Sequence, residues 1–165
     1  MKIEKARTVK VADEVWIATA LLHRENPERD DFSVDEIVDR ARREGLHEEL
    51  RPGVRVHVLQ HCVANRAPDP GRYCMLTETG KMRRRLWRSG DPVHPKRIGA
   101  KSVPQKSDIP EEYSALLDWY HRSQSGHMQK NVVRDPILKL RGLGREISKG
   151  VDSDEYVRKL REGWE

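Results

Sequence analysis

The sequence predicts an α+β protein: a mainly α-helical domain with a small β-hairpin, followed by an extended or helical C-terminal tail. Two observations support this. Apolar residues recur at steps of three and four in three stretches before residue 65. Two short strand-like runs, separated by a turn that contains glycine, then follow. We expect a domain over residues 1–122, a linker over residues 123–134 and a tail over residues 135–165.

The first predicted helix runs from Ala12 to Asn26 and stops before Pro27. Its apolar positions cover a broad face, which indicates that it packs against more than one neighbour. Glu28–Asp31 is expected to be a charged loop.

A second helix is predicted from its capping pattern. Ser33 and Glu36 have the spacing of a capping box, in which each side chain accepts a hydrogen bond from the backbone N–H of the other residue. Phe32 and Ile37 flank this box in the positions of a hydrophobic staple. Gly45 is the expected stop, because glycine readily adopts the left-handed conformation at a helix end. The apolar stripe comprises Val34, Ile37, Val38 and Ala41.

The third predicted helix runs from about Pro52–Gly53 to Ala64. At 100° per residue, one side is apolar and contains Val54, Val56, Val58, Leu59, Cys62 and Val63. The other side carries polar groups and a small residue: His57, Gln60, His61 and Ala64, with Asn65 at its edge. Such a face suits the reading of base edges, where Asn and Gln match adenine.

Two strands are predicted next, Tyr73–Thr77 and Met82–Arg88, joined by Glu78–Lys81. Gly80 is available for the positive φ that a tight turn requires. Three helices followed by a basic hairpin resemble a winged helix-turn-helix domain over roughly residues 10–90. That resemblance implies that the third helix enters the major groove of DNA and that the hairpin touches the backbone or the minor groove.

The charge distribution agrees with a nucleic-acid partner. Residues 51–106 contain thirteen Lys or Arg and three acidic residues, a net charge of +10, whereas residues 1–50 carry −4 and residues 107–165 carry −1. A basic surface between near-neutral flanks favours a polyanion such as double-stranded DNA. The candidate DNA-binding residues are Arg51, Arg55, His57, Gln60, His61, Asn65, Arg66, Lys81, Arg83, Arg84 and Arg85.

The chain after the hairpin is less regular. Residues 89–109 contain three prolines and no periodicity, which predicts an irregular segment over the domain that extends the basic surface. A helix is expected from Glu111 to about Arg122, with Pro110 at its start. Its apolar face, which comprises Tyr113, Leu116, Leu117 and Tyr120, either closes the core or forms a homodimer contact.

The tail carries a second resemblance. Leu140-Arg-Gly-Leu-Gly-Arg-Glu-Ile147 and Asp152-Ser-Asp-Glu-Tyr-Val-Arg-Lys-Leu-Arg-Glu-Gly-Trp-Glu165 resemble the toxin-binding tail of VapB-type antitoxins. This implies that about 30 residues wrap a PIN-domain toxin, a small Mg²⁺-dependent ribonuclease, and that the N-terminal domain binds the promoter of its own operon. The candidate toxin-binding residues are Ile137, Leu140, Leu143, Ile147, Tyr156, Val157, Arg158, Leu160, Arg161 and Trp164, with Lys159 as a further cation able to reach the metal site of the toxin.

The sequence departs from that family in its N-terminal part. VapB-type antitoxins usually carry small AbrB-like, ribbon-helix-helix or Phd-type heads, whereas residues 1–122 have the pattern of a longer winged-helix domain. The alternatives are a stand-alone winged-helix transcription regulator, and a DNA-targeting subunit of a restriction or phage-defence complex.

Other classes receive little support. We expect no enzyme, because no paired carboxylates with a lysine, Ser/His/Asp set or phosphate loop stands out. Cys62 lies opposite His57 and His61 on the predicted helix, so neither a metal nor a cofactor is expected. Two cysteines and no run of about 20 apolar residues favour a cytoplasmic protein without a membrane partner.

Overall fold

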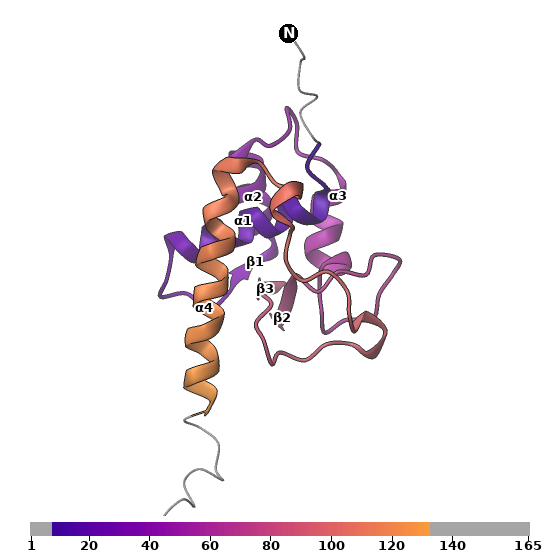
Figure 1. Ribbon diagram of the computed structural model, residues 1–165. Helices are drawn as coiled ribbons and strands as arrows, with labels where there is room; N and C mark the ends of the chain where they lie inside the picture. Colours follow the sequence, from indigo (N-terminus) through magenta and orange to yellow (C-terminus); the bar gives the residue numbers. More distant parts are fainter. Residues whose placement is uncertain (1–7, 133–165) are drawn as a thin grey trace, which may run out of the picture. The chain divides into compact units, whose positions relative to one another are not determined.

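The computed structural model describes residues 8–132, and for residues 126–132 it describes the backbone alone. The described residues up to His127 form one compact unit of helices and a small antiparallel sheet (Figure 1), which confirms the α+β class. The helices are α1 (Val11–Glu25), α2 (Val34–Glu44), α3 (Gly53–Val56), the π-helix η1 (His57–His61), the 3-10 helices η2 (Pro95–Arg97), η3 (Lys106–Asp108) and η4 (Glu111–Tyr113), and α4 (Ser114–Val132). The strands are β1 (Phe32–Ser33), β2 (Leu76–Gly80) and β3 (Arg83–Leu86).

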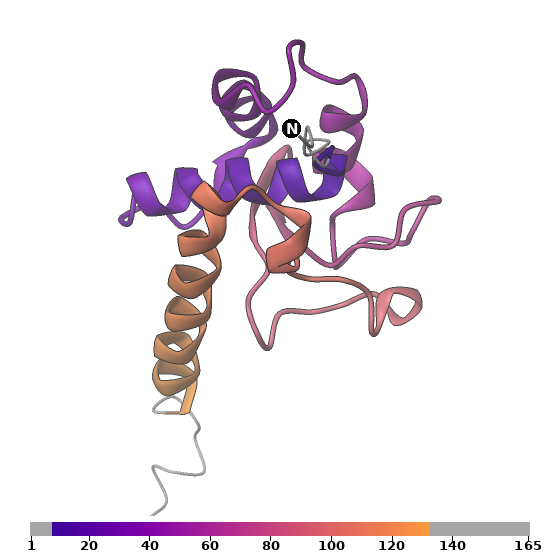
Figure 2. The ribbon, with the colours of Figure 1, turned by 45° about the horizontal axis from the view of Figure 1, so that its top comes forward.

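Helix α1 lies at the centre of the core. Every residue from Ala12 to His23 is buried, as expected for a helix surrounded by others. Figure 2 shows α1 crossing the unit, with α2 on one side and α4 leading away from it on the other. Trp16 packs edge-to-face on Tyr120 of α4, with 5.6 Å between the ring centroids. The position of α1 agrees with the predicted helix to within one residue at each end.

The predicted capping of α2 is confirmed. The Ser33 hydroxyl accepts from the Glu36 N–H at 3.2 Å, and the Glu36 carboxylate accepts from the Ser33 N–H at 2.8 Å. Gly45 ends the helix in the left-handed conformation, at φ 65°. Phe32 and Ile37 are fully buried. Because a capping box needs only residues close in sequence, this end of the helix is specified locally.

The sheet has three antiparallel strands in the order β1-β3-β2. Strand β1 is an element that the sequence did not predict: Phe32 and Ser33 pair with Arg84 and Arg83 across the sheet. The two residues that start α2 therefore also tie its N-terminus to the hairpin.

The hairpin lies where the sequence places it, but its strands and turn differ from the prediction. Strand β2 starts at Leu76 rather than Tyr73, and β3 ends at Leu86 rather than Arg88. Met82 adopts the positive φ of the turn, 56°, whereas the prediction assigned this role to Gly80, which pairs with Arg83 beside a bulge. The bulge inserts one residue into β2 and so moves the turn towards Met82.

The third helix is confirmed at its start and wrong at its end. After Val56 the chain forms the π-helix η1, in which the Cys62 N–H donates to the His57 carbonyl at 2.9 Å, five residues back. The helix ends at His61 rather than Ala64. A π-helical turn holds more residues than an α-helical turn, yet Val58, Cys62 and Val63 of the predicted apolar side are still buried. Val56, predicted on the apolar side, is 45% exposed.

The segment after the hairpin closes the domain. The helix expected from Glu111 begins as η4, continues as α4 to Val132, and buries Tyr113, Leu116, Leu117 and Tyr120 in the core. This supports core closure, the first of the two predicted roles for this face. The expected linker is helical over residues 123–132. Residues 133–165, which contain the remainder of the linker and every candidate toxin-binding residue, lie outside the described part of the chain.

His23 links α1 to the sheet in its neutral form. The buried Leu86 N–H donates to His23 Nε2 at 3.2 Å, and the His23 ring packs edge-on to Phe32, with 4.9 Å between the ring centroids. An imidazole nitrogen that accepts a hydrogen bond cannot also carry a proton. Burial, with the nearby Arg88 and Arg85 charges, lowers the pKa of His23 to about 4.

We expect the domain to lose about 3 kcal/mol of stability through His23 as the pH falls from 7 to 4. Between those pH values the unfolded chain, with an ordinary histidine pKa near 6.5, binds a proton that the folded chain does not. Urea unfolding of the wild type and His23→Gln at several pH values measures this, and the variant should show a shallower slope. His121→Gln, a change at an exposed position of α4, should keep the wild-type slope; equal slopes in all three proteins would contradict the assignment.

Candidate nucleic-acid interface

Most cations of the basic segment 51–106 form ion pairs within the domain. Arg51 donates to the buried Glu14 carboxylate at 2.5 Å, and the Lys101 ammonium contacts Asp13 at 2.7 Å and Asp108 at 2.8 Å. Six further residues of the segment pair with acidic side chains: Arg55 with Asp35, Arg66 and Arg84 with Glu78, Arg83 with Asp31, Arg85 with Asp91, and Arg88 with Asp30. The local charge excess is therefore much larger in the sequence than on the surface.

Arg97 is buried, has no carboxylate partner within residues 8–132, and is held by backbone carbonyls. Its Nε donates to Arg66 O at 2.6 Å. Nη1 donates to the carbonyls of His61 and Tyr73 at 2.7 and 2.8 Å, and Nη2 to those of Gln60 and Ala67 at 2.8 and 3.3 Å. A guanidinium has five N–H donors, and here all five are used. Arg97 is 1% exposed, although the sequence predicted that its segment would extend a basic surface.

Arg84 binds the same helix end from the hairpin. Its guanidinium donates to Val58 O and Leu59 O, both at 3.2 Å, and lies 3.3 Å from Glu78. Together, Arg84 and Arg97 satisfy the last carbonyls of η1, which have no partners within the helix. A positive charge at this end also interacts favourably with the helix dipole. Burial lowers the pKa of both guanidinium groups, but arginine stays charged in proteins.

The polar face predicted for the third helix is engaged inside the domain. Asn65 pairs with the backbone of Glu78 through two hydrogen bonds of 3.0 Å, and the Gln60 amide donates to Ala67 O at 2.7 Å. His57 Nδ1 lies 2.8 Å from Gly53 O. These side chains and His61 are half-buried, so the face is less open than the sequence predicted, and base reading by these residues stays a prediction.

Loop residues 66–73 cover His61 closely. A Cβ at Gly71 would lie 2.6 Å from the His61 Cβ, closer than real atoms approach. The position therefore requires glycine, and the backbone of the loop lies directly on the imidazole. The sequence signal for this contact was the turn-rich run around Gly71, but nothing local identified its partner.

The three consecutive arginines of the hairpin differ from one another. Arg84 is 1% exposed, Arg85 forms a two-pronged pair with Asp91 at 2.6 Å, and Arg83 pairs with Asp31 at 2.5 Å. The exposed side chains at the turn are Lys81 and Met82. An alanine replacement of all three arginines would therefore remove core contacts as well as surface charge.

The exposed residues form two candidate contact regions. On α3, Arg55 is exposed beside Val56, and its ion pair with the exposed Asp35 carries little energy. At the hairpin turn, Lys81 is exposed beside Met82. Four exposed cations of the segment have no ion pair within residues 8–132: Arg72, Lys81, Lys96 and Lys106. Arg72 and Lys96 were not among the predicted DNA-binding residues, because their exposure depends on the fold of the loops.

Neither cysteine is paired or exposed. Cys62 and Cys74 are free and buried, and burial raises the pKa of both thiols. The two histidine rings, His57 and His61, meet edge-to-face with 4.8 Å between centroids. Within residues 8–132, no group of three or more His, Cys, Asp or Glu side chains has the arrangement of a metal site.

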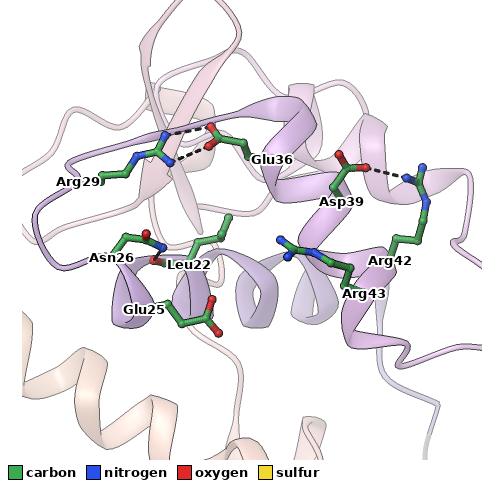
Figure 3. A pocket seen from close by; sticks show the side chains of 8 residues that line it. All are labelled: Leu22, Glu25, Asn26, Arg29, Glu36, Asp39, Arg42 and Arg43. Atoms are coloured by element: carbon green, nitrogen blue, oxygen red, sulfur yellow. Dashed lines mark hydrogen bonds and ion pairs between the residues drawn. The ribbon is translucent and has the colours of Figure 1, made fainter.

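An open groove of 640 Å³ lies between the end of α1 and α2 (Figure 3). Four of its charged residues form two pairs: Arg29 donates to Glu36 at 2.7 and 3.0 Å, and Arg42 to Asp39 at 2.7 Å. The Arg29 hydrogen bonds and those from Ser33 lower the pKa of Glu36 to about 2. Its lining carries three arginines and three acidic residues, so it offers no net charge to a polyanion.

No protein-family model, curated protein or solved structure matches the chain. Among the described helices, none is both long and apolar enough to cross a lipid bilayer.

Replacing Arg97 with lysine should destabilise the domain by about 3 kcal/mol. An ammonium has three donors instead of five, so at least two of the five hydrogen bonds to the surrounding carbonyls are lost, at about 1.5–3 kcal/mol for each bond to a charged group. Chemical denaturation measures the difference. Arg122→Lys, at an exposed position of α4, is the matched control and should change stability by less than about 0.5 kcal/mol. Equal stability of Arg97→Lys and the wild type would contradict the role given to the carbonyl contacts.

Proposed function

We propose that the described domain is a winged-helix DNA-binding domain and that the whole chain is an antitoxin. The observation that supports the DNA-binding half is topological. The elements follow the order α1-β1-α2-α3-β2-β3, and the short strand between the first two helices pairs with the second strand of the hairpin. This is the order and pairing typical of winged-helix domains, in which the third helix faces the major groove.

The proposed DNA contacts differ from those that the sequence favoured. Arg55 and Val56 are the exposed residues on α3, and Lys81 and Met82 are exposed at the hairpin turn. Arg55 is suited to a guanine edge or a phosphate, because it exchanges a weak surface ion pair with Asp35 for the contact. Lys81 is suited to a phosphate of the backbone. His57, Gln60, His61 and Asn65 then support the helix rather than read bases.

The antitoxin half of the proposal rests on the resemblance of the tail. The spacing of Gly142, Gly144 and the run from Asp154 to Trp164 resembles that of a VapB-type toxin-binding segment. An amphipathic run with a terminal tryptophan is suited to folding onto a partner, since a buried Trp is a frequent anchor of interfaces. With the two activities on one chain, DNA binding would serve to control the supply of the antitoxin.

Arg55→Ala and Lys81→Ala should each weaken binding to a duplex from the upstream promoter region. Each removes about one phosphate-neutralising charge, so the slope of log K against log salt should become shallower by about 1. Arg42→Ala, which removes an exposed charge from α2, should leave the slope unchanged. If all three variants keep the wild-type slope, α3 and the hairpin do not form the DNA-binding surface.

Truncation after Val132 should abolish toxin neutralisation and leave DNA binding intact. Co-expression with a PIN-domain ribonuclease encoded beside the protein gives the first readout, and duplex binding by the truncated protein gives the second. Trp164→Ala in the full chain should weaken toxin binding at least thirtyfold, the equivalent of about 2 kcal/mol, whereas Glu165→Ala should change it little. Growth protection by the truncated protein would exclude the tail as the neutralising segment.

A further inference from the structure

Two loops that are distant in sequence are joined at the C-terminal end of the third helix. The first, residues 66–73, follows η1, and the second, residues 94–101, follows the hairpin and contains η2. The Arg97 side chain of the second loop binds three carbonyls of the first, those of Arg66, Ala67 and Tyr73. Figures 1 and 2 show the two loops projecting side by side.

Backbone contacts hold the second loop at both ends. The His94 N–H donates to Ala64 O at 2.8 Å, and the Cys74 N–H donates to Lys101 O at 2.9 Å. The Lys101 ammonium is in turn held by Asp13 and Asp108. The loop pair is thus attached to η1, to the start of the hairpin and to α1, which favours a rigid surface over a flexible one.

The outer side of the loop pair is basic and partly apolar. Arg72 and Lys96 are exposed and form no ion pair within residues 8–132. Ile98 is 77% exposed, the largest value among the exposed large hydrophobic residues described. Residues 92–107 contain no acidic residue, and Asp69 is the one acidic residue of the first loop. Arg72 and Lys96 thus differ from most arginines of the basic segment, which form ion pairs with acidic side chains.

We propose that this loop pair is a second phosphate-contacting surface, which binds the nucleic-acid backbone beyond the region covered by α3 and the hairpin turn. Arg72 and Lys96 contact phosphates, and Ile98 packs against the sugar edge between them. Arg97 touches no nucleic acid and is a positioning residue, because it fixes the two loops against the helix. This inference rests on the proposed DNA-binding function and extends its footprint.

The spacing favours a nucleic acid over an acidic protein. Arg55 and His61, to which Arg97 attaches the loop pair, are six residues apart, which is at most about 9 Å along the axis, because 1.5 Å per residue is the α-helical rise and η1 is a wider π-helix. Duplex DNA carries a charge for about every 1.7 Å of its axis, so a duplex in contact with Arg55 presents several phosphates over that distance. Electrostatic contacts with a repeating backbone need no matched pocket.

The test is the salt dependence of duplex binding by Arg72→Gln/Lys96→Gln in the full chain. Loss of two phosphate contacts should make the slope of log K against log salt shallower by about 2, and should weaken binding about thirtyfold at 0.15 M salt. Hydroxyl-radical protection should shorten at one end of the footprint. Arg42→Gln/Arg43→Gln removes the same net charge from exposed positions of α2 and should leave the slope and the footprint unchanged.

The outcomes separate the two proposals. If Arg72→Gln/Lys96→Gln keeps the wild-type slope and footprint while Arg55→Ala does not, the protein binds DNA without the loop pair, and this inference fails alone. If the wild type binds no duplex, both proposals fail. If the double variant loses binding to polyglutamate but binds duplex DNA as the wild type does, the surface would be assigned to an acidic protein instead.

Discussion

The packing of the described domain depends on the C-terminal end of the third helix, where backbone carbonyls need hydrogen-bond donors. A helix that stops inside a protein leaves its last carbonyls without partners, and burial of unpaired carbonyls is costly. Arg84 and Arg97 reach this end from the hairpin and from the loop after it, and they donate to the carbonyls of residues 58–61. Each guanidinium thereby joins the helix to a segment more than twenty residues away.

Because of these internal contacts, residues 51–106 place fewer positive charges at the surface than their sequence suggests. A charge must reach the surface to contact a polyanion directly, whereas a buried charge contributes only to the field of the whole protein. Here Arg84 and Arg97 lie in the interior, and Arg51 and Lys101 pair with the buried Glu14 and Asp13. The proposal of DNA binding therefore rests on the topology and on a few exposed side chains rather than on the charge count.

The buried acidic residues of α1 also have a structural role, because they bind cations from distant segments. Asp13 and Glu14 lie in the first turn of the helix, where negative charge interacts favourably with the helix dipole. Burial raises the pKa of Asp13, although the Lys101 ammonium opposes the shift. Since removal of one partner would leave the other charged and buried, Lys101 fastens the segment after the hairpin to the central helix.

Local features of the sequence determined a large part of the fold. The extent of α1, the capping box at Ser33, the stop at Gly45 and the apolar face of α4 depend on residues within a few positions of one another, and all were predicted. The class of the domain followed from the order of these elements. The functional resemblance of the tail also came from a short run of sequence, and it stands as a proposal.

Only the tertiary structure decided which polar residues are exposed. The change to a π-helix after Val56, the pairing of β1 with β3 and the burial of Arg97 all depend on partners distant in the chain. As a result, His57, Gln60, His61 and Asn65 turned from an open face into internal contacts, while Arg55, Arg72 and Lys96 remained at the surface. A periodic pattern states which side of a regular helix is polar, but the satisfaction of each hydrogen bond depends on the loops that pack against it.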